Sequence, residues 1–162
     1  MARAGHRRLA GRPRPSGGPA MTAGGEQQIR ALLETRTRAF ARRDAATAAA
    51  GYDDDLVLYD AVGPLVRRGE DPADRLERWI GSYRTGIGHE IRDLEITAGA
   101  DLAFCHFLVR ISGTMRDGTE VGMWVRATSC LRRRGDAWTI VHEHASVPFD
   151  ADTGRAELRA EL

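Results

Sequence analysis

The sequence predicts an α+β domain, because amphipathic helices come first and alternating segments follow. Residues 26–43 place apolar side chains, among them Ile29, Leu33 and Phe40, at helical spacing. After Gly86 the pattern changes, and apolar and polar residues alternate through most of the remaining chain. We therefore expect a curved antiparallel sheet wrapped around N-terminal helices, with a cavity wherever the concave face is not filled.

Capping signals mark the helices between these two regions. Asp44 can cap a short alanine-rich helix that ends near Gly51, and residues 56–60 have the composition of a strand. Asp71 at the N-cap and Pro72 at the first position begin a further helix. The apolar stripe of this helix consists of Leu76, Trp79, Ile80 and Tyr83.

Four strands are expected after this helix, over residues 89–98, 102–114, 120–132 and 137–148. The turn sequences TAGAD, MRDGT and RRRGD separate them, so they predict an antiparallel meander. Alternation also divides each strand into two faces. One face of the second strand carries Phe104, His106, Leu108 and Arg110, and one face of the third carries Trp124, Arg126, Thr128 and Cys130.

Composition predicts one domain, at residues 26–149, between two tails. The chain has 162 residues, of which 42% are hydrophobic and 29% charged. Residues 1–25 are rich in Arg, Gly and Pro and are expected to be disordered, and residues 150–162 form a C-terminal tail. Five of the 24 basic residues lie in the first 20 positions, which leaves 19 against 23 acidic residues, a formal charge of −4. This balance argues against a nucleic-acid partner.

The expected location is the cytoplasm. The pair Arg7 and Arg8 is not followed by the apolar segment of a signal peptide, and no apolar run approaches the ~20 residues of a membrane span. Met21 is a second candidate for the natural start. Cys105 and Cys130 have no CxxC spacing and lie in apolar strand patterns, so we expect buried free thiols.

Two stretches, YDDDLVLYDAVGPLVRRG and LRRRGDAWTIVHEHASVPF, resemble the nuclear-transport-factor-2-like superfamily. The first is similar to the first strand and turn of ketosteroid isomerases, and the second to the terminal hairpin of SnoaL-like domains and of the calcium/calmodulin-dependent kinase association domain. The resemblance covers about residues 26–149 and implies a cone-shaped sheet around a cavity. It says little about function, because this fold carries enzymes, binding proteins and scaffolds.

The resemblance assigns site residues. Asp60 falls where the isomerases keep their catalytic aspartate, whereas Arg36 and Thr128 take the places of the tyrosine and protonated aspartate of their oxyanion hole. Arg110 matches a cavity arginine of the association domain, and the same comparison turns Glu143 inward. The expected catalytic residues are Asp60, Glu143 and His106. The expected substrate-binding residues are Arg36, Trp79, Tyr83, Phe104, Arg110, Trp124, Arg126 and Thr128.

Some of these residues also have structural interpretations. Glu143 could form an ion pair with a buried arginine, His106 could be a core histidine, and Arg36 could extend past its stem to solvent. His142 and His144 share a strand face, but no third metal ligand of matching parity is evident, so no metal is expected. We expect these histidines, with Trp138 and Ile140, to face outward into a homodimer contact.

Two classes of function remain open. In the first, Asp60 acts as general base, without a cofactor, on an enolisable, anionic or polyketide-like small molecule that is isomerised or cyclised. In the second, the domain is a non-catalytic ligand-binding or oligomerisation module whose arginines pair with Asp60 and Glu143. A free Asp60 favours the enzyme, and an Asp60 bridged to arginine favours the module, because such a bridge stabilises the carboxylate.

Overall fold

The computed structural model describes residues 23–158 and contains three helices and a five-stranded sheet. The helices are α1 (Ala23–Arg42), α2 (Ala45–Ala49) and α3 (Pro72–Gly81). The strands are β1 (Tyr52–Tyr59), β2 (Gly88–Ala98), β3 (Leu102–Thr114), β4 (Glu120–Arg134) and β5 (Ala137–Ser146). This α+β architecture confirms the predicted fold class.

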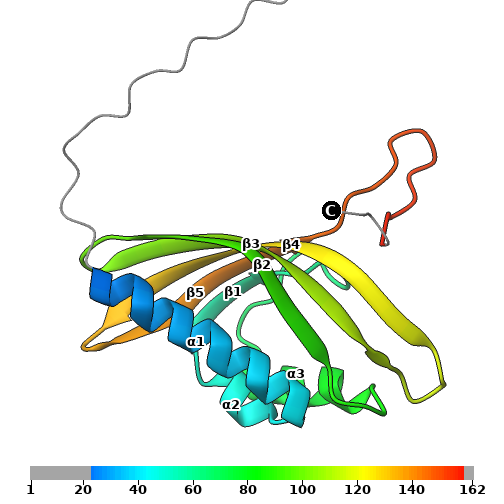
Figure 1. Cartoon of the computed structure of the whole chain (residues 1–162), viewed down its shortest axis with the longest axis horizontal. Helices are drawn as coiled ribbons and strands as arrows, with labels where there is room; N and C mark the ends of the chain where they lie inside the picture. The colour runs from blue at the N-terminus through cyan, green and yellow to red at the C-terminus, as the bar shows by residue number, and fades with distance from the viewer. Residues whose placement is uncertain (1–22, 159–162) are drawn as a thin grey trace, which may run out of the picture.

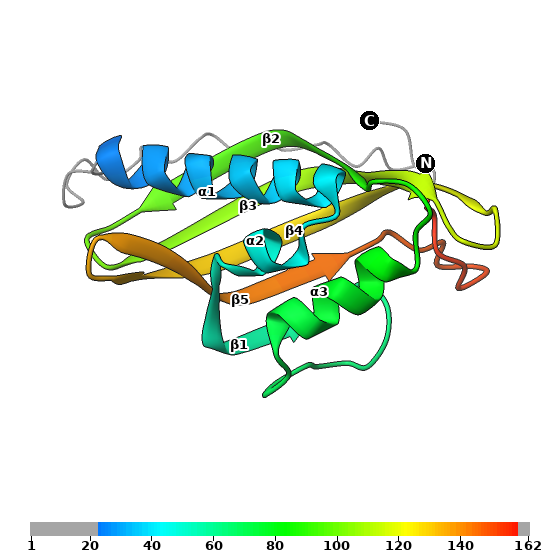
Figure 2. The same cartoon turned by 90° about the horizontal axis from the view of Figure 1, so that it is seen from below.

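The five strands are arranged in the order β1-β5-β4-β3-β2. Strands β2 to β5 form the predicted antiparallel meander, but β1 pairs with β5 in parallel, so the sheet is mixed and not purely antiparallel. All three helices lie on one side of the sheet, with α1 beside β2 and α3 beside β1 (Figure 1 and Figure 2). We call the side that carries the helices the inner face.

The core lies between the helices and the inner face. Ile29, Leu33 and Phe40 of α1 and Leu76 and Ile80 of α3 are buried there, as their helical spacing predicts. The Asp71 carboxylate accepts hydrogen bonds from the backbone N–H groups of Ala73 and Asp74 and so caps α3. These contacts fix both helices against the sheet.

Strand β5 contains a bulge that alternation did not predict. Ile140 pairs with Leu131 of β4, but the next pair is His142 with Cys130, so Val141 is an extra residue. Trp138 and Ile140 before the bulge are therefore buried, and the prediction that they face outward is wrong. Beyond the bulge the inward residues are odd-numbered, and Glu143 is the first of them.

The ends of the domain differ slightly from the predicted boundaries. Helix α1 begins at Ala23, three residues before the predicted start, and the rest of the predicted disordered tail lies outside the described residues. After β5, a bridge between Phe149 and Ala156 closes a turn in the C-terminal segment. Within residues 23–158, no helix is both long and apolar enough to cross a bilayer.

Candidate functional site

A cavity of about 400 Å³ lies between α1, α3 and the inner face of the sheet. Its walls are mainly apolar, because β3 and β4 turn one side of their alternating pattern toward it. The principal wall residues are Phe107, Val109 and Ile111 of β3, Met123, Val125 and Ala127 of β4, and Trp79 of α3. A cavity of this size and lining suits a small organic molecule.

An ion pair between Arg36 of α1 and Glu143 of β5 occupies one end of the cavity. Arg36 Nη1 donates to Glu143 Oε2 at 3.1 Å, and Arg36 Nη2 donates to the Tyr52 hydroxyl. The Tyr52 hydroxyl donates to Glu143 Oε1 at 2.9 Å, and Ser129 Oγ donates to Oε2 at 3.1 Å. Glu143 therefore accepts three hydrogen bonds, and its place just beyond the bulge at Val141 makes this possible.

The charges in this network stabilise one another. Burial alone would raise the pKa of Glu143, but the Arg36 guanidinium and the three donors hold it below its usual value. Burial alone would lower the pKa of Arg36, but Tyr52 and Glu143 raise it overall. Burial is the largest of the effects that raise the pKa of Tyr52 to about 12. This pattern is that of a permanent ion pair, which supports the structural interpretation of Glu143.

His89 of β2 also lines the cavity. Its Nδ1 lies 3.1 Å from Thr37 Oγ1, and its ring centroid lies 4.8 Å from that of Phe40. The start of β2 is held against α1 by the hydrogen bond from Ile87 N to Phe40 O, and Gly86 approaches Ala41 too closely to allow a Cβ. Burial and the nearby Arg36 charge lower the pKa of His89 to about 4, so the ring is neutral at pH 7.

Charged side chains of the β1–α3 region line another part of the cavity, which we call the charged rim and define as Asp60, Arg67, Glu70, Arg75 and Arg78. Asp60 Oδ2 lies 3.9 Å from Arg67 Nε and 3.8 Å from Arg75 Nη1. Glu70 pairs with Arg78 and, at 3.4 Å, with Arg67. Asp60 is thus bridged to arginine.

Four of the residues expected to form the site do line the cavity, namely Arg36, Asp60, Trp79 and Glu143. Tyr83 is buried beside Trp79, with ring centroids 5.8 Å apart, but does not line the cavity. Arg36 neither extends to solvent nor stands free, because its guanidinium is buried against Glu143. The partner of Glu143 is therefore Arg36 and not Arg110 or Arg126.

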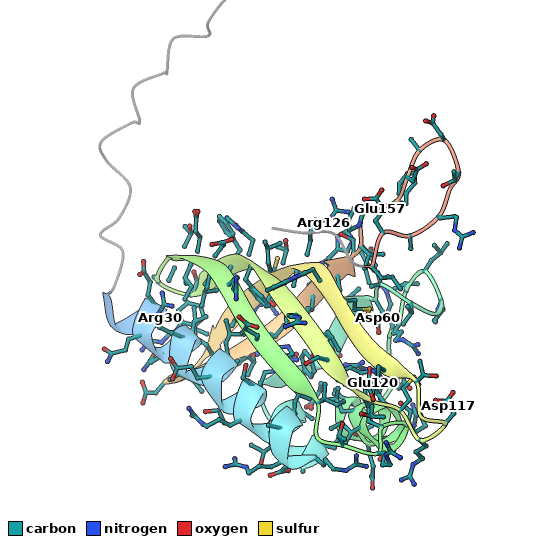
Figure 3. All side chains as sticks on the ribbon, turned by 45° about the vertical axis from the view of Figure 1, so that its right-hand side comes forward. Arg30, Asp60, Asp117, Glu120, Arg126 and Glu157 are labelled. Atoms are coloured by element: carbon teal, nitrogen blue, oxygen red, sulfur yellow. The ribbon has the colours of Figure 1, made fainter. Side chains whose placement is uncertain are left out.

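The remaining six expected residues do not reach the cavity, and the placement predicted for them is wrong. Their side chains lie on the outer face of β3 and β4, on the side of the sheet away from the helices, where Arg126 is labelled in Figure 3. The buried residues of β3 are instead the odd-numbered ones from Ala103 to Ile111. The misplaced residues are Phe104, His106, Arg110, Trp124, Arg126 and Thr128.

The sequence did contain a signal for the correct face. Every odd-numbered residue from Ala103 to Ile111 is apolar, whereas the even-numbered ones include His106 and Arg110, and the more apolar face of a strand is normally the buried one. Several polar cavity residues were also missed, among them Tyr52, Arg67, Arg75 and His89. No spacing pattern identifies these four, because they come together only through the parallel pairing of β1 and the packing of α1 and α3 on the sheet.

Comparisons with known proteins agree with this architecture. Residues 29–150 match the family model described as SnoaL-like domain. An NTF2-like protein of unknown function from Pseudomonas putida is 30% identical, with a TM-score of 0.78, and the match covers 88% of this chain and all of that protein. No curated protein matches this chain.

Two further solved structures share the fold. A protein from Xanthomonas campestris, named as a calcium/calmodulin-dependent protein kinase II association domain, is 23% identical with a TM-score of 0.64. The match covers 81% of this chain and 94% of that one. A protein from Streptomyces avermitilis, named as a dehydratase of the NTF2-like family, is 18% identical with a TM-score of 0.64, and the match covers 75% and 94%. At these identities the likeness shows the fold alone.

Proposed function

The chain belongs to the SnoaL-like domain family, and we propose that it binds a small, largely apolar organic molecule and moves a proton on it without a cofactor, as an isomerase or cyclase does. The observation that carries this proposal is the position of His89. Its imidazole lines a cavity whose walls are mainly apolar, and its Nε2 makes no hydrogen bond to any described residue. A neutral ring nitrogen of this kind can accept a proton from a bound substrate.

Thr37 and Arg36 determine the tautomer and the basicity of the imidazole. When Nδ1 carries the proton and donates it to Thr37 Oγ1, the lone pair of Nε2 is available to the cavity. A pKa of about 4 makes the ring a weak base by itself, but a negative charge that develops on the substrate would stabilise the imidazolium. The Arg36 guanidinium would stabilise the same developing enolate.

Asp60 is the second candidate for the base. Its carboxylate lines the cavity but lies between Arg67 and Arg75, so both cations compete with a substrate for its Oδ2. The Nε2 of His89 has no such neighbour within hydrogen-bond distance among the described residues, which is why we favour it. Four arginines and three carboxylates line the cavity, and this surplus of one positive charge favours an anionic, enolisable substrate of the polyketide type.

Hydrogen–deuterium exchange tests the proposed proton transfer directly. The probes are 2-tetralone, 4-phenyl-2-butanone and 4-oxo-4-phenylbutanoic acid, each followed by NMR in deuterated water at pH 7. The wild-type chain should accelerate exchange at the carbon beside the ketone, and His89→Gln should reduce this acceleration by about 100-fold or more. His144→Gln, on the outer face, should exchange like wild type.

The alternative function is a ligand-binding or oligomerisation module without catalysis. The observation that favours it concerns the two carboxylates first considered as catalytic. Asp60 and Glu143 both line the cavity, and both are paired with arginines. Probes that bind without faster exchange would support the module and overturn the enzyme proposal. If Asp60→Asn abolishes exchange while His89→Gln does not, the base is Asp60.

A further inference from the structure

The charged rim holds one carboxylate between two guanidinium groups without a hydrogen bond to either. Asp60 Oδ2 lies 3.9 Å from Arg67 Nε and 3.8 Å from Arg75 Nη1, and both distances exceed the range of a hydrogen bond. All three side chains line the cavity. Asp60 therefore balances charge here but leaves donors of both arginines unused.

Arg67 contains a buried donor that has no partner. Its Nε is inaccessible to solvent and makes no hydrogen bond to the described residues. The backbone holds this side chain in place, because Arg67 N donates to Leu58 O at 2.9 Å and Leu58 N donates to Arg67 O at 3.1 Å. Buried N–H groups are nearly always paired in folded proteins, so this unpaired donor on a side chain that lines the cavity shows that the protein itself does not use the full hydrogen-bonding capacity of Arg67.

The other end of the cavity offers anions much less. At that end Glu143 and Tyr52 already occupy both terminal nitrogens of Arg36, and its Nε, which is also buried and unpaired, belongs to a guanidinium whose charge Glu143 balances. At the charged rim three arginines face only two carboxylates, Asp60 and Glu70. The positive charge that remains unbalanced is therefore on the rim, and an acidic ligand would place its charge there.

We propose that Arg67 and Arg75 bind the carboxylate of a monoacidic ligand at the charged rim, while the apolar body of the ligand fills the cavity between Trp79 and the β3–β4 wall. The carboxylate accepts from the guanidinium groups of Arg67 and Arg75, since planar guanidinium groups suit such paired contacts. A single unbalanced positive charge matches a monocarboxylate better than a doubly charged phosphate. This inference rests on the proposed function only in that the cavity takes a ligand.

Matched acids and amides test the inference. The probes are 2-naphthoic acid and 4-phenylbutanoic acid, each compared with its primary amide by titration calorimetry at pH 7. Wild type should bind each acid about 10-fold or more tightly than its amide. Arg67→Gln and Arg75→Gln should bring this ratio close to one and leave amide affinity unchanged. Arg68→Gln, at the exposed neighbouring position, should keep the wild-type ratio.

Thermal melting of each variant checks that it is folded before it is titrated. Equal binding of acid and amide by wild type, or a ratio that survives in both Arg67→Gln and Arg75→Gln, overturns the proposed carboxylate site but not the ligand cavity. If Arg68→Gln lowers the acid-to-amide affinity ratio as much as Arg67→Gln and Arg75→Gln do, the site is also overturned. The preference for acids would then come from the overall positive charge of the loop. If wild type binds neither acids nor amides, the proposed function fails as well.

Discussion

At the scale of single residues, Glu143 is the counter-charge of a buried cation. Its substitution by Gln keeps the volume but leaves the Arg36 guanidinium buried without a negative partner. Loss of one partner of a buried ion pair typically costs 3–5 kcal/mol, so we expect Glu143→Gln to lower the free energy of unfolding by about 3 kcal/mol. Urea denaturation measures this loss.

Two variants make that experiment specific. Glu95→Gln removes a carboxylate whose side chain is 79% exposed on the outer face, and it should change stability by less than about 0.5 kcal/mol. The double variant Arg36→Met, Glu143→Gln removes both charges and should recover part of the loss. If Glu143→Gln is as stable as wild type, the ion pair between Arg36 and Glu143 does not stabilise the fold.

His89 gives the protein a pH-dependent stability. Burial and the Arg36 charge lower its pKa from 6.5 to about 4, so below pH 6.5 the unfolded chain binds a proton that the folded chain refuses. The free energy of unfolding should therefore have its full value above pH 6.5. It should fall by up to about 3 kcal/mol as the pH decreases toward 4. Urea denaturation at half-unit pH steps measures the slope.

The variant His89→Gln provides the comparison for this slope. It cannot be protonated, so between pH 6.5 and about 5 its stability should be nearly flat. Glu143, whose pKa is held below 4.5, contributes a loss only at lower pH. If the free energy of unfolding changes with pH equally in the variant and in wild type, the fold does not lower the pKa of His89.

The individual site residues differ in how far the sequence could predict them. Resemblance singled out Asp60, which directly follows β1, and Glu143, which lies on β5, and both side chains line the cavity. The resemblance also assigned Arg110 to the cavity. The alternation of apolar residues along β3 predicts instead that Arg110 lies on the opposite, outer face, and the structure agrees with the alternation. His89 has no partner nearby in the sequence, since Thr37 lies 52 residues away, so only the packing of β2 on α1 reveals its role.

At the scale of elements, the helices and strands were predictable, but the register of the sheet was not. Caps and periodicity placed α3 and the four-strand meander within a few residues of their observed limits. The bulge at Val141 and the shift between Arg92 and Glu95 have no such signal. A single extra residue reverses every later side chain, which is why Ile140 and Glu143 can both face inward.

The bulge therefore links local backbone geometry to the chemistry of the site. With strict alternation, either Trp138 and Ile140 or Glu143 would face the helices, but not both. The bulge lets β5 contribute apolar residues to the core in its first half and a carboxylate to the cavity in its second. Helix α3 acts in a similar way, since its N-cap by Asp71 sets the position from which Arg75 and Trp79 reach the cavity.

At the scale of the whole molecule, the outer face of the sheet remains the expected site of homodimer formation, although for a different reason. Trp138 and Ile140, on which the expectation rested, are in the core. In their place Phe104 is 46% exposed on the outer face of β3, with Leu108 and Trp124 partly exposed on the same side of the sheet. An aromatic and aliphatic patch on an open sheet face is typical of a symmetric interface.

We therefore expect wild type to be a dimer by light scattering at micromolar concentration, and Phe104→Glu to be a monomer, because two carboxylates would meet apolar surface across the two-fold axis. Phe149→Glu supplies the matched control: Phe149 is 68% exposed but lies beyond β5, outside the sheet face, so this variant should remain dimeric. A monomeric wild type would remove the interface altogether. Dissociation by Phe149→Glu and not by Phe104→Glu would move it to the C-terminal segment, and the histidines of the outer face would then have no part in assembly.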